Sequence, residues 1–324
     1  MNKNKKKLLV IIIITSICMF SSISVFAANI PESYLGLQDW DHTRVVGIKD
    51  IDNTSAGDKT KYPSGKHPYR FTNSGAMQLV GTTAYCIKPN QTLTQAYLFT
   101  INNATDKSKA KLSSTVKVSG SLGKANGMAY NSKDGLFYVA THTAPGSGSQ
   151  IIAINKSGKI QRAYNCSKRV TSITYYKNID TNTNQFIIGE NQTENFHLLN
   201  IDGSKSGTAT IVKSFVINPA NAVSSTLSAQ DIEYQSGYLY TPITINENGV
   251  LKRNKILKIN FAEALAGNKI VYTILKDDSS TKSSLNKYEV ESIDFYGGKM
   301  YASVNAENAT TKGYDGIYYI YKRN

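Results

Sequence analysis

The chain has 324 residues, and its 37 lysines and arginines against 23 aspartates and glutamates give a formal net charge of +14. This length is enough for one large domain with its own core. The positive charge has no basic helix and no basic–aromatic RNA-binding signature beside it, so we do not expect nucleic acid as a partner. The lysines are spread thinly, which leaves two interpretations: a well-hydrated surface, or attraction to a polyanion.

The first 27 residues have the pattern of a secretory signal peptide. Four of the first seven residues are lysines, an apolar run extends from Leu8 to about Phe20, and Val25-Phe26-Ala27 is a small-x-small cleavage site. Removal of these lysines lowers the formal charge from +14 to +10. We therefore expect a secreted, extracellular protein with one domain over residues 28–324. We expect no transmembrane segment in the mature chain, because no later stretch is long and apolar enough.

A short unit recurs five times: an apolar residue, a variable one, an aromatic residue or leucine, a tight turn, and an aromatic-rich strand. The five copies are Met77–Leu79, Met128–Tyr130, Ile173–Tyr175, Ile232–Tyr234 and Ile293–Phe295. A repeat of about 40 to 60 residues built only from strands is typical of a β-propeller. The sequence therefore predicts an all-β fold, a five-bladed β-propeller.

Each copy begins a predicted antiparallel unit of four strands. Turn signals that favour tight hairpins follow the first strand, such as Asp134-Gly135 and Gly297-Gly298. Dense apolar runs typical of buried strands follow as the third strand. These runs are Tyr97–Ile101, Ile151–Ile154, His197–Ile201, Ile256–Ile259 and Ile317–Ile320. Fourth strands are predicted over Ser114–Val118, Ile160–Tyr164, Ile211–Ile217 and Ile270–Leu275.

The fifth unit has no fourth strand of its own, whereas Val45 to Ile51 is a predicted strand outside any unit. We expect this N-terminal strand to join the last blade and close the ring, which removes exposed sheet edges. Phe261 to Ala266 is predicted to form one or two helical turns, and residues 50–67 to form a long exposed loop.

Polar residues precede or lie within the first strand of each unit and should face the central channel. Asp231, Glu233, Glu291 and Asp294 are the candidate catalytic residues, since adjacent carboxyl groups serve as acid, base or nucleophile in glycoside hydrolysis. Such oxygen ligands also suit Ca²⁺, and a third interpretation is a wet channel lined for solvation alone. No other metal and no organic cofactor is expected. The candidate ligand-binding residues are Asn126, Gln230, Asp231, Glu291 and Ser292.

Two cysteines, Cys86 and Cys166, follow the signal peptide. In an exported chain they form either one disulfide or two half-buried thiols. They do not form a cluster with the spacing of a structural zinc site. His197 lies in a predicted third strand and is expected to be packed.

The segment Val290–Val304 resembles the C-terminal repeat of the helveticin J-like proteins, a family of class III bacteriocins. The similarity extends to Gln230–Tyr234 with its partner strand Lys255–Phe261, and more weakly to Lys124–His142. The resemblance implies a secreted antibacterial protein that acts on the envelope of other bacteria. It supplies no catalytic residues, and this chain departs from the family in its signal peptide and its connecting loops.

Three functions follow from these observations. The first is a secreted helveticin J-like bacteriocin that binds a bacterial envelope glycopolymer or an anionic cell surface. The second is a glycosidase-like hydrolase that uses the channel carboxyl groups, and the third is a non-toxic, lectin-like propeller. An enzyme is the less favoured class, because the chain has no diagnostic catalytic motif.

Overall fold

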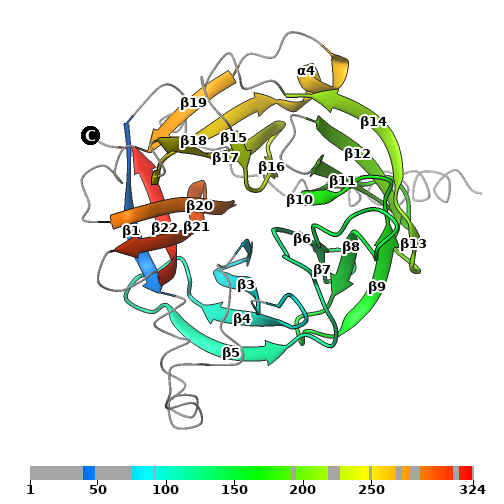
Figure 1. Ribbon diagram of the computed structural model, residues 1–324, viewed down its shortest axis with the longest axis horizontal. Coiled ribbons are helices and arrows are strands. Elements are labelled where there is room, and N and C mark those ends of the chain that lie inside the picture. The colour runs from blue at the N-terminus through cyan, green and yellow to red at the C-terminus, as the bar shows by residue number, and fades with distance from the viewer. Residues whose placement is uncertain are drawn as a thin grey trace, which may run out of the picture.

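The computed structural model describes residues 39–47, 75–90, 92–190, 195–217, 227–247, 250–267, 272–277, 285–308 and 314–322. The strands of these residues form sheets arranged around a common centre, in a propeller-like, all-β architecture (Figure 1). The predicted signal peptide and the predicted loop over residues 50–67 lie outside the described residues. Among the residues that the structure does describe, no helix is long and apolar enough to cross a bilayer.

The first three sequence repeats form three separate antiparallel sheets, with one short parallel strand added to the second. The first contains β2 (Ala76–Val80), β3 (Thr83–Pro89), β4 (Ala96–Asn102) and β5 (Lys111–Lys117). The second contains β6 (Gly127–Asn131), β7 (Leu136–Ala140), β8 (Ile151–Ile154), β9 (Ile160–Asn165) and the short β13 (Gly207–Thr208). The third contains β10 (Val170–Asn178), β11 (Thr183–Glu190), β12 (Asn195–Asp202) and β14 (Thr210–Val216).

The fourth and fifth repeats share one nine-stranded sheet. The fourth repeat contributes β15 (Leu227–Ala229), β16 (Glu233–Gln235), β17 (Tyr238–Glu247), β18 (Val250–Asn260) and β19 (Tyr272–Asp277). The fifth contributes β20 (Leu285–Tyr296), β21 (Lys299–Asn308) and β22 (Tyr314–Lys322). The hydrogen-bonded strands thus make four sheets, not five separate ones.

The N-terminal strand β1 (Asp39–Gly47) joins these two groups of strands. It pairs antiparallel with β22, with Val46 opposite Ile317 and Trp40 opposite Lys322. On its other edge two residue pairs connect it in parallel with β19. The predicted pairing of an N-terminal strand with the last strand is therefore confirmed. The strand begins at Asp39 instead of Val45, and residues 48–51 lie outside the described residues.

The core lies between neighbouring sheets, where apolar side chains from both faces interdigitate. Ile87 and Leu98 of the first sheet pack in one cluster with Phe137 of the second. Tyr301 of β21 packs in another cluster with Met77 of β2. The last repeat therefore buries apolar surface against the first, and this contact supports the strand pairing that closes the ring.

The single described helix is α4 (Phe261–Ala266), as the sequence predicts. The side chain of Asn260 caps its N-terminus by accepting a hydrogen bond from the Glu263 N–H (3.2 Å). Gly267 ends the helix in the left-handed conformation (φ 74°), where a side chain is disfavoured. Phe261 and Ala264 are buried in one cluster with Phe196 and Phe215 of the third repeat, so the helix packs between the third and fourth repeats.

Cys86 and Cys166 are buried free thiols, so they do not form a disulfide. Burial raises the pKa of the Cys166 thiol. His197 is buried as predicted. Its ring lies 2.8 Å from Ser214 Oγ and 3.3 Å from Glu190 Oε2, and burial lowers its pKa.

Candidate functional site

The first strand of each repeat lies nearest the centre of the ring; these inner strands are β2, β6, β10, β16 and β20 (Figure 1). In three of the five copies, the side chain of the middle residue of the repeated unit accepts a hydrogen bond from a backbone N–H of the adjacent inner strand. The bonds run from Tyr130 N–H to Gln78 Oε1 (3.2 Å), from Tyr234 N–H to Thr174 Oγ1 (3.0 Å) and from Leu79 N–H to Asp294 Oδ2 (2.5 Å). These middle residues therefore connect the repeats around the centre.

Asp294 is the member of this set that connects the last repeat with the first. Its Oδ2 accepts from both the Leu79 N–H and the Gln78 side-chain amide, each at 2.5 Å. Its Oδ1 accepts from the Phe295 N–H at 2.6 Å. The residue is 5 % exposed, and all three donors are neutral. Oδ2 therefore connects the last repeat with the first, while Oδ1 is occupied by a hydrogen bond within β20.

Asp231 has a similar role between the second, third and fourth repeats. Its Oδ1 accepts from the Ile232 N–H at 2.9 Å, and the Ile173 N–H also donates to the carboxyl group. A Cβ atom on Gly127 would lie 2.7 Å from Asp231 Oδ1. Glycine is therefore needed at position 127, where β6 approaches the carboxyl group closely.

Of the three channel acids, Glu233 accepts the fewest hydrogen bonds from the described residues. Its Oε2 accepts from the Thr174 hydroxyl at 3.2 Å, and its side chain stays partly exposed. Asp231 and Asp294 are almost fully buried. Glu233 is therefore the most exposed of the three acids.

The three carboxyl groups are close enough to influence one another. Burial raises the pKa of Asp294 to about 7 and those of Asp231 and Glu233 well above the usual range. The negative charge of Asp294 raises the pKa of the other two further. None of the three forms an ion pair with a described lysine, arginine or histidine. We define the channel site as these three acids together with Gln78 and Thr174.

The other predicted site residues lie near the start of the inner strands. Gln230 donates from its side-chain amide to Glu289 Oε1 at 2.5 Å, a contact outside the channel site. Glu291 and Ser292 are buried in β20, and Asn126, which precedes β6, is partly buried. Of the predicted site residues, the structure therefore brings Asp231, Glu233 and Asp294 together. They are close enough for the charge of Asp294 to raise the pKa of the other two.

Sequence reasoning missed Gln78, Thr174, Gly127 and Glu289 as parts of this region. Gln78 and Thr174 occupy the same middle position of the repeated unit as Glu233 and Asp294, so the alignment of the copies contained the signal. Within the described residues, no group of three histidine, cysteine, aspartate or glutamate side chains is arranged to hold a metal ion. The alternative of a Ca²⁺ site therefore gains no geometric support there.

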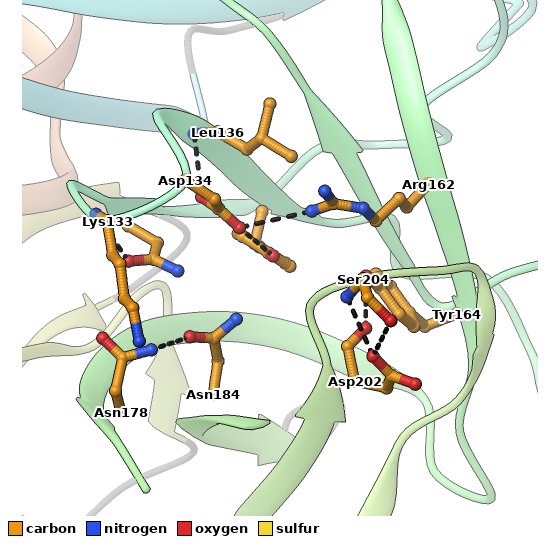
Figure 2. A network of polar contacts seen from close by, with 11 residues as sticks. Lys133, Asp134, Leu136, Arg162, Tyr164, Asn178, Asn184, Asp202 and Ser204 are labelled. Carbon is orange, nitrogen blue, oxygen red and sulfur yellow. Dashed lines mark hydrogen bonds and ion pairs between the residues drawn. The ribbon is translucent and has the colours of Figure 1, made fainter. Parts of the chain in front are cut away.

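A second polar network lies between the second and third repeats, and Figure 2 shows its members pointing toward one another. Asp134 Oδ2 accepts from the Tyr138 hydroxyl at 2.6 Å and from Arg162 at 3.3 Å. Asp134 Oδ1 accepts from the Leu136 N–H at 3.0 Å. The Tyr164 hydroxyl donates to the Asp202 carbonyl oxygen at 2.9 Å. We call these residues the Asp134 network; within it the Asp134 carboxylate is paired with Arg162.

No protein-family model and no curated protein matches this chain. Solved structures that the chain matches include Kuenenia stuttgartiensis hydrazine synthase (14 % identity, TM-score 0.39), BT0996 in an RGII complex (10 %, 0.42) and RS223 β-xylosidase (8 %, 0.42). The matches cover 76, 84 and 78 % of this chain, and 60, 96 and 92 % of those proteins. The chain thus spans less than two thirds of the hydrazine synthase chain.

Proposed function

We propose that this protein is a secreted propeller that binds a glycopolymer of the bacterial envelope without cleaving it. The observation that carries the proposal is the bonding of the two channel aspartates. Asp231 and Asp294, which the sequence puts forward for catalysis, each accept a hydrogen bond from a backbone N–H of another repeat, Ile173 for Asp231 and Leu79 for Asp294. Their role is therefore to hold the repeats together.

Glycoside hydrolysis needs two carboxyl groups that flank the reacting bond, one for proton transfer and one as base or nucleophile. In the channel site only Glu233 is partly exposed, and it lacks a second accessible carboxyl partner among Asp231 and Asp294. A single accessible acid suits hydrogen bonding to sugar hydroxyl groups better than it suits the two-carboxylate mechanism. Binding is therefore favoured over hydrolysis.

We infer that the ring contains five blades, one for each repeat. Two features support this count: each copy of the unit begins or lies within an inner strand, and among the described strands the fourth and fifth repeats are connected within one sheet only through the two β1–β19 pairs, Asp39 with Lys276 and Trp40 with Asp277. The net charge of about +10 after removal of the signal peptide supports an anionic partner. The resemblance to the helveticin J-like family supports a bacterial target.

Purified protein incubated with labelled bacterial cell walls tests the proposal. We expect the protein to sediment with the walls and to release no soluble sugar or peptide. Release of soluble product that is lost in Glu233→Gln would establish the hydrolase instead. A killing assay on sensitive cells then separates a bacteriocin from a lectin-like protein, since only the first kills.

A further inference from the structure

Three lysines of consecutive repeats have a tyrosine ring as their partner. Lys156 Nζ lies 5.3 Å from the centre of the Tyr130 ring and 5.9 Å from that of Tyr85. The other two distances are 4.9 Å from Lys177 Nζ to the Tyr176 ring and 3.8 Å from Lys258 Nζ to the Tyr238 ring. We call these groups the Lys–Tyr pairs. An ammonium group over an aromatic face is attracted by the ring quadrupole and keeps its other donors available.

The Lys–Tyr pairs contrast with the lysines of two exposed hairpin turns. Lys109 forms an ion pair with Asp106 (3.3 Å), and Lys205 forms one with Asp202 (3.9 Å). No such carboxylate neutralises Lys156, Lys177 or Lys258 among the described residues. The exposed ammonium groups of Lys156 and Lys177 are therefore open to an external anion, whereas that of Lys258 is buried.

All three pairs lie at the same end of the ring. Equivalent residues of adjacent inner strands are joined by hydrogen bonds, such as Tyr130 to Gln78 and Tyr234 to Thr174, so these strands run in the same direction at the same level. The turns that follow the inner strands consequently lie at one end, which we call the turn end. Tyr130 and Tyr176 come just before such turns, and Tyr238 comes directly after one.

Exposure differs among the three lysines. Lys156 and Lys177 are exposed, whereas Lys258 is 6 % exposed and packs over Tyr238, which is partly exposed. Burial without a carboxylate partner lowers the pKa of Lys258. A buried, unpaired cation is unfavourable by itself, so a bound anion at this position would compensate a cost that the free protein carries.

The chemistry of the pairs fits a sugar that carries a phosphate. A tyrosine ring stacks on the apolar face of a sugar, and the adjacent ammonium binds a negative group on it. Lysine binds phosphate as a point charge, whereas planar carboxylates favour the fork of an arginine. None of the three pairs contains an arginine. Their repetition on the second, third and fourth repeats matches a polymer in which the negative charge also repeats.

We propose that the turn end is the docking surface for a phosphodiester-linked cell-wall glycopolymer. This inference rests on the proposed function, because it names the surface and the ligand class of the envelope binding suggested above. It differs from that proposal in assigning the affinity to the Lys–Tyr pairs at the turn end, and not to the channel site.

The test uses two double variants with the same change of charge. Lys156→Glu with Lys177→Glu removes two exposed ammonium groups of the turn end. Lys124→Glu with Lys213→Glu is the matched control, because both lysines are exposed and lie away from the inner turns. Binding is measured on purified walls before and after treatment with cold hydrofluoric acid, which removes the phosphodiester polymer. Vesicles of phosphatidylglycerol with phosphatidylcholine report binding to an anionic membrane.

We expect the turn-end variant to bind untreated walls about tenfold more weakly than the wild type, and the control to change by less than about threefold. Acid-treated walls should bind the wild type as weakly as untreated walls bind the turn-end variant. Equal losses in the two variants, unchanged wild-type binding to acid-treated walls, or binding to vesicles alone would each overturn the inference. Failure of the wild type to bind any wall preparation would instead overturn the proposed function.

A third variant, Lys258→Met, is tested for both its stability to unfolding and its binding to walls. The two measurements separate an effect on binding from an effect on folding. The variant keeps the length and apolar stem of the side chain but removes the ammonium, so we expect equal or higher stability and weaker wall binding. A variant that folds stably and binds walls like the wild type would remove Lys258 from the proposed surface.

Discussion

The channel site holds almost fully buried aspartates and the Asp134 network a partly buried one, and the two regions satisfy these carboxyl groups differently. Asp134 has a guanidinium, a phenol and a backbone N–H as donors, so part of its charge is matched by a cation. Asp294 is bonded only by neutral N–H donors and lies near two other acids. The channel is thus held together by hydrogen bonds that act against charge repulsion, whereas in the Asp134 network hydrogen bonding and charge attraction act together.

The largest effect is expected from Asp294→Ala. The change leaves the buried Leu79 and Phe295 N–H groups without their acceptor and should lower the free energy of unfolding by about 3 kcal/mol. Urea unfolding at neutral pH measures it. Asp106→Ala is the control, because that carboxylate serves only an exposed turn, and its loss should stay below about 1 kcal/mol. Equal losses in the two variants would show that the ring does not depend on Asp294.

Removal of Asp134 should have the next largest effect. Asp134→Ala takes the acceptor from the Tyr138 hydroxyl and the Leu136 N–H and the partner from Arg162, so we expect a loss of about 2 kcal/mol. Tyr138→Phe removes only the hydroxyl and should cost about 1 kcal/mol. A larger loss in Tyr138→Phe than in Asp134→Ala, in the same unfolding assay, would contradict this ranking.

The pH dependence of stability distinguishes the two regions. The pKa of Asp294 is raised in the folded state, so its contribution to stability is fully present below the unfolded pKa and is lost as the pH rises through about 7. The free energy of unfolding should therefore be about 1 kcal/mol higher at pH 6 than at pH 8. Asp294→Asn should reduce this difference between pH 6 and pH 8, and should reduce it more than Asp134→Asn does. A wild-type profile that rises from pH 6 to pH 8 would refute the interpretation.

The smallest effect, and one of opposite sign, is expected from Glu233→Gln. Glutamine still accepts the Thr174 hydroxyl hydrogen bond but needs neither a buried charge nor an added proton, so stability at pH 8 should increase by about 0.5 to 1 kcal/mol. The gain should disappear near pH 4, where the unfolded acid is also protonated. Thermal unfolding at both pH values measures it, and a loss of stability at pH 8 would indicate an additional charged partner of Glu233.

Much of the fold follows from local pattern. The third strands, the four fourth strands and the helix over Phe261–Ala266 were all predictable, because dense apolar runs and turn residues act within a few positions of the chain. The N-terminal strand was predictable from the missing strand of the fifth repeat. Its start at Asp39 was not, because polar residues extend the pairing beyond the apolar segment.

The candidate site was predictable only in part. The acids of the fourth and fifth copies stand out in the alignment of the repeats, and Asp231, Glu233 and Asp294 do meet. Their hydrogen-bond donors could not be predicted, because those donors lie on other repeats. Gln78 and Asp294 are separated by 216 positions, and nothing local marks either as the partner of the other.

The sequence by itself determined the repeated strands, the positions of the turns and the presence of acids on the inner strands, because side-chain alternation and turn chemistry are local. Only the tertiary structure decided what those acids do. Closure of the ring brings Leu79 N–H to Asp294 and Ile173 N–H to Asp231, and so turns candidate catalytic groups into bonds between repeats. Folding likewise places the lysine of each Lys–Tyr pair over its tyrosine ring, since that contact depends on how strands and turns pack in three dimensions.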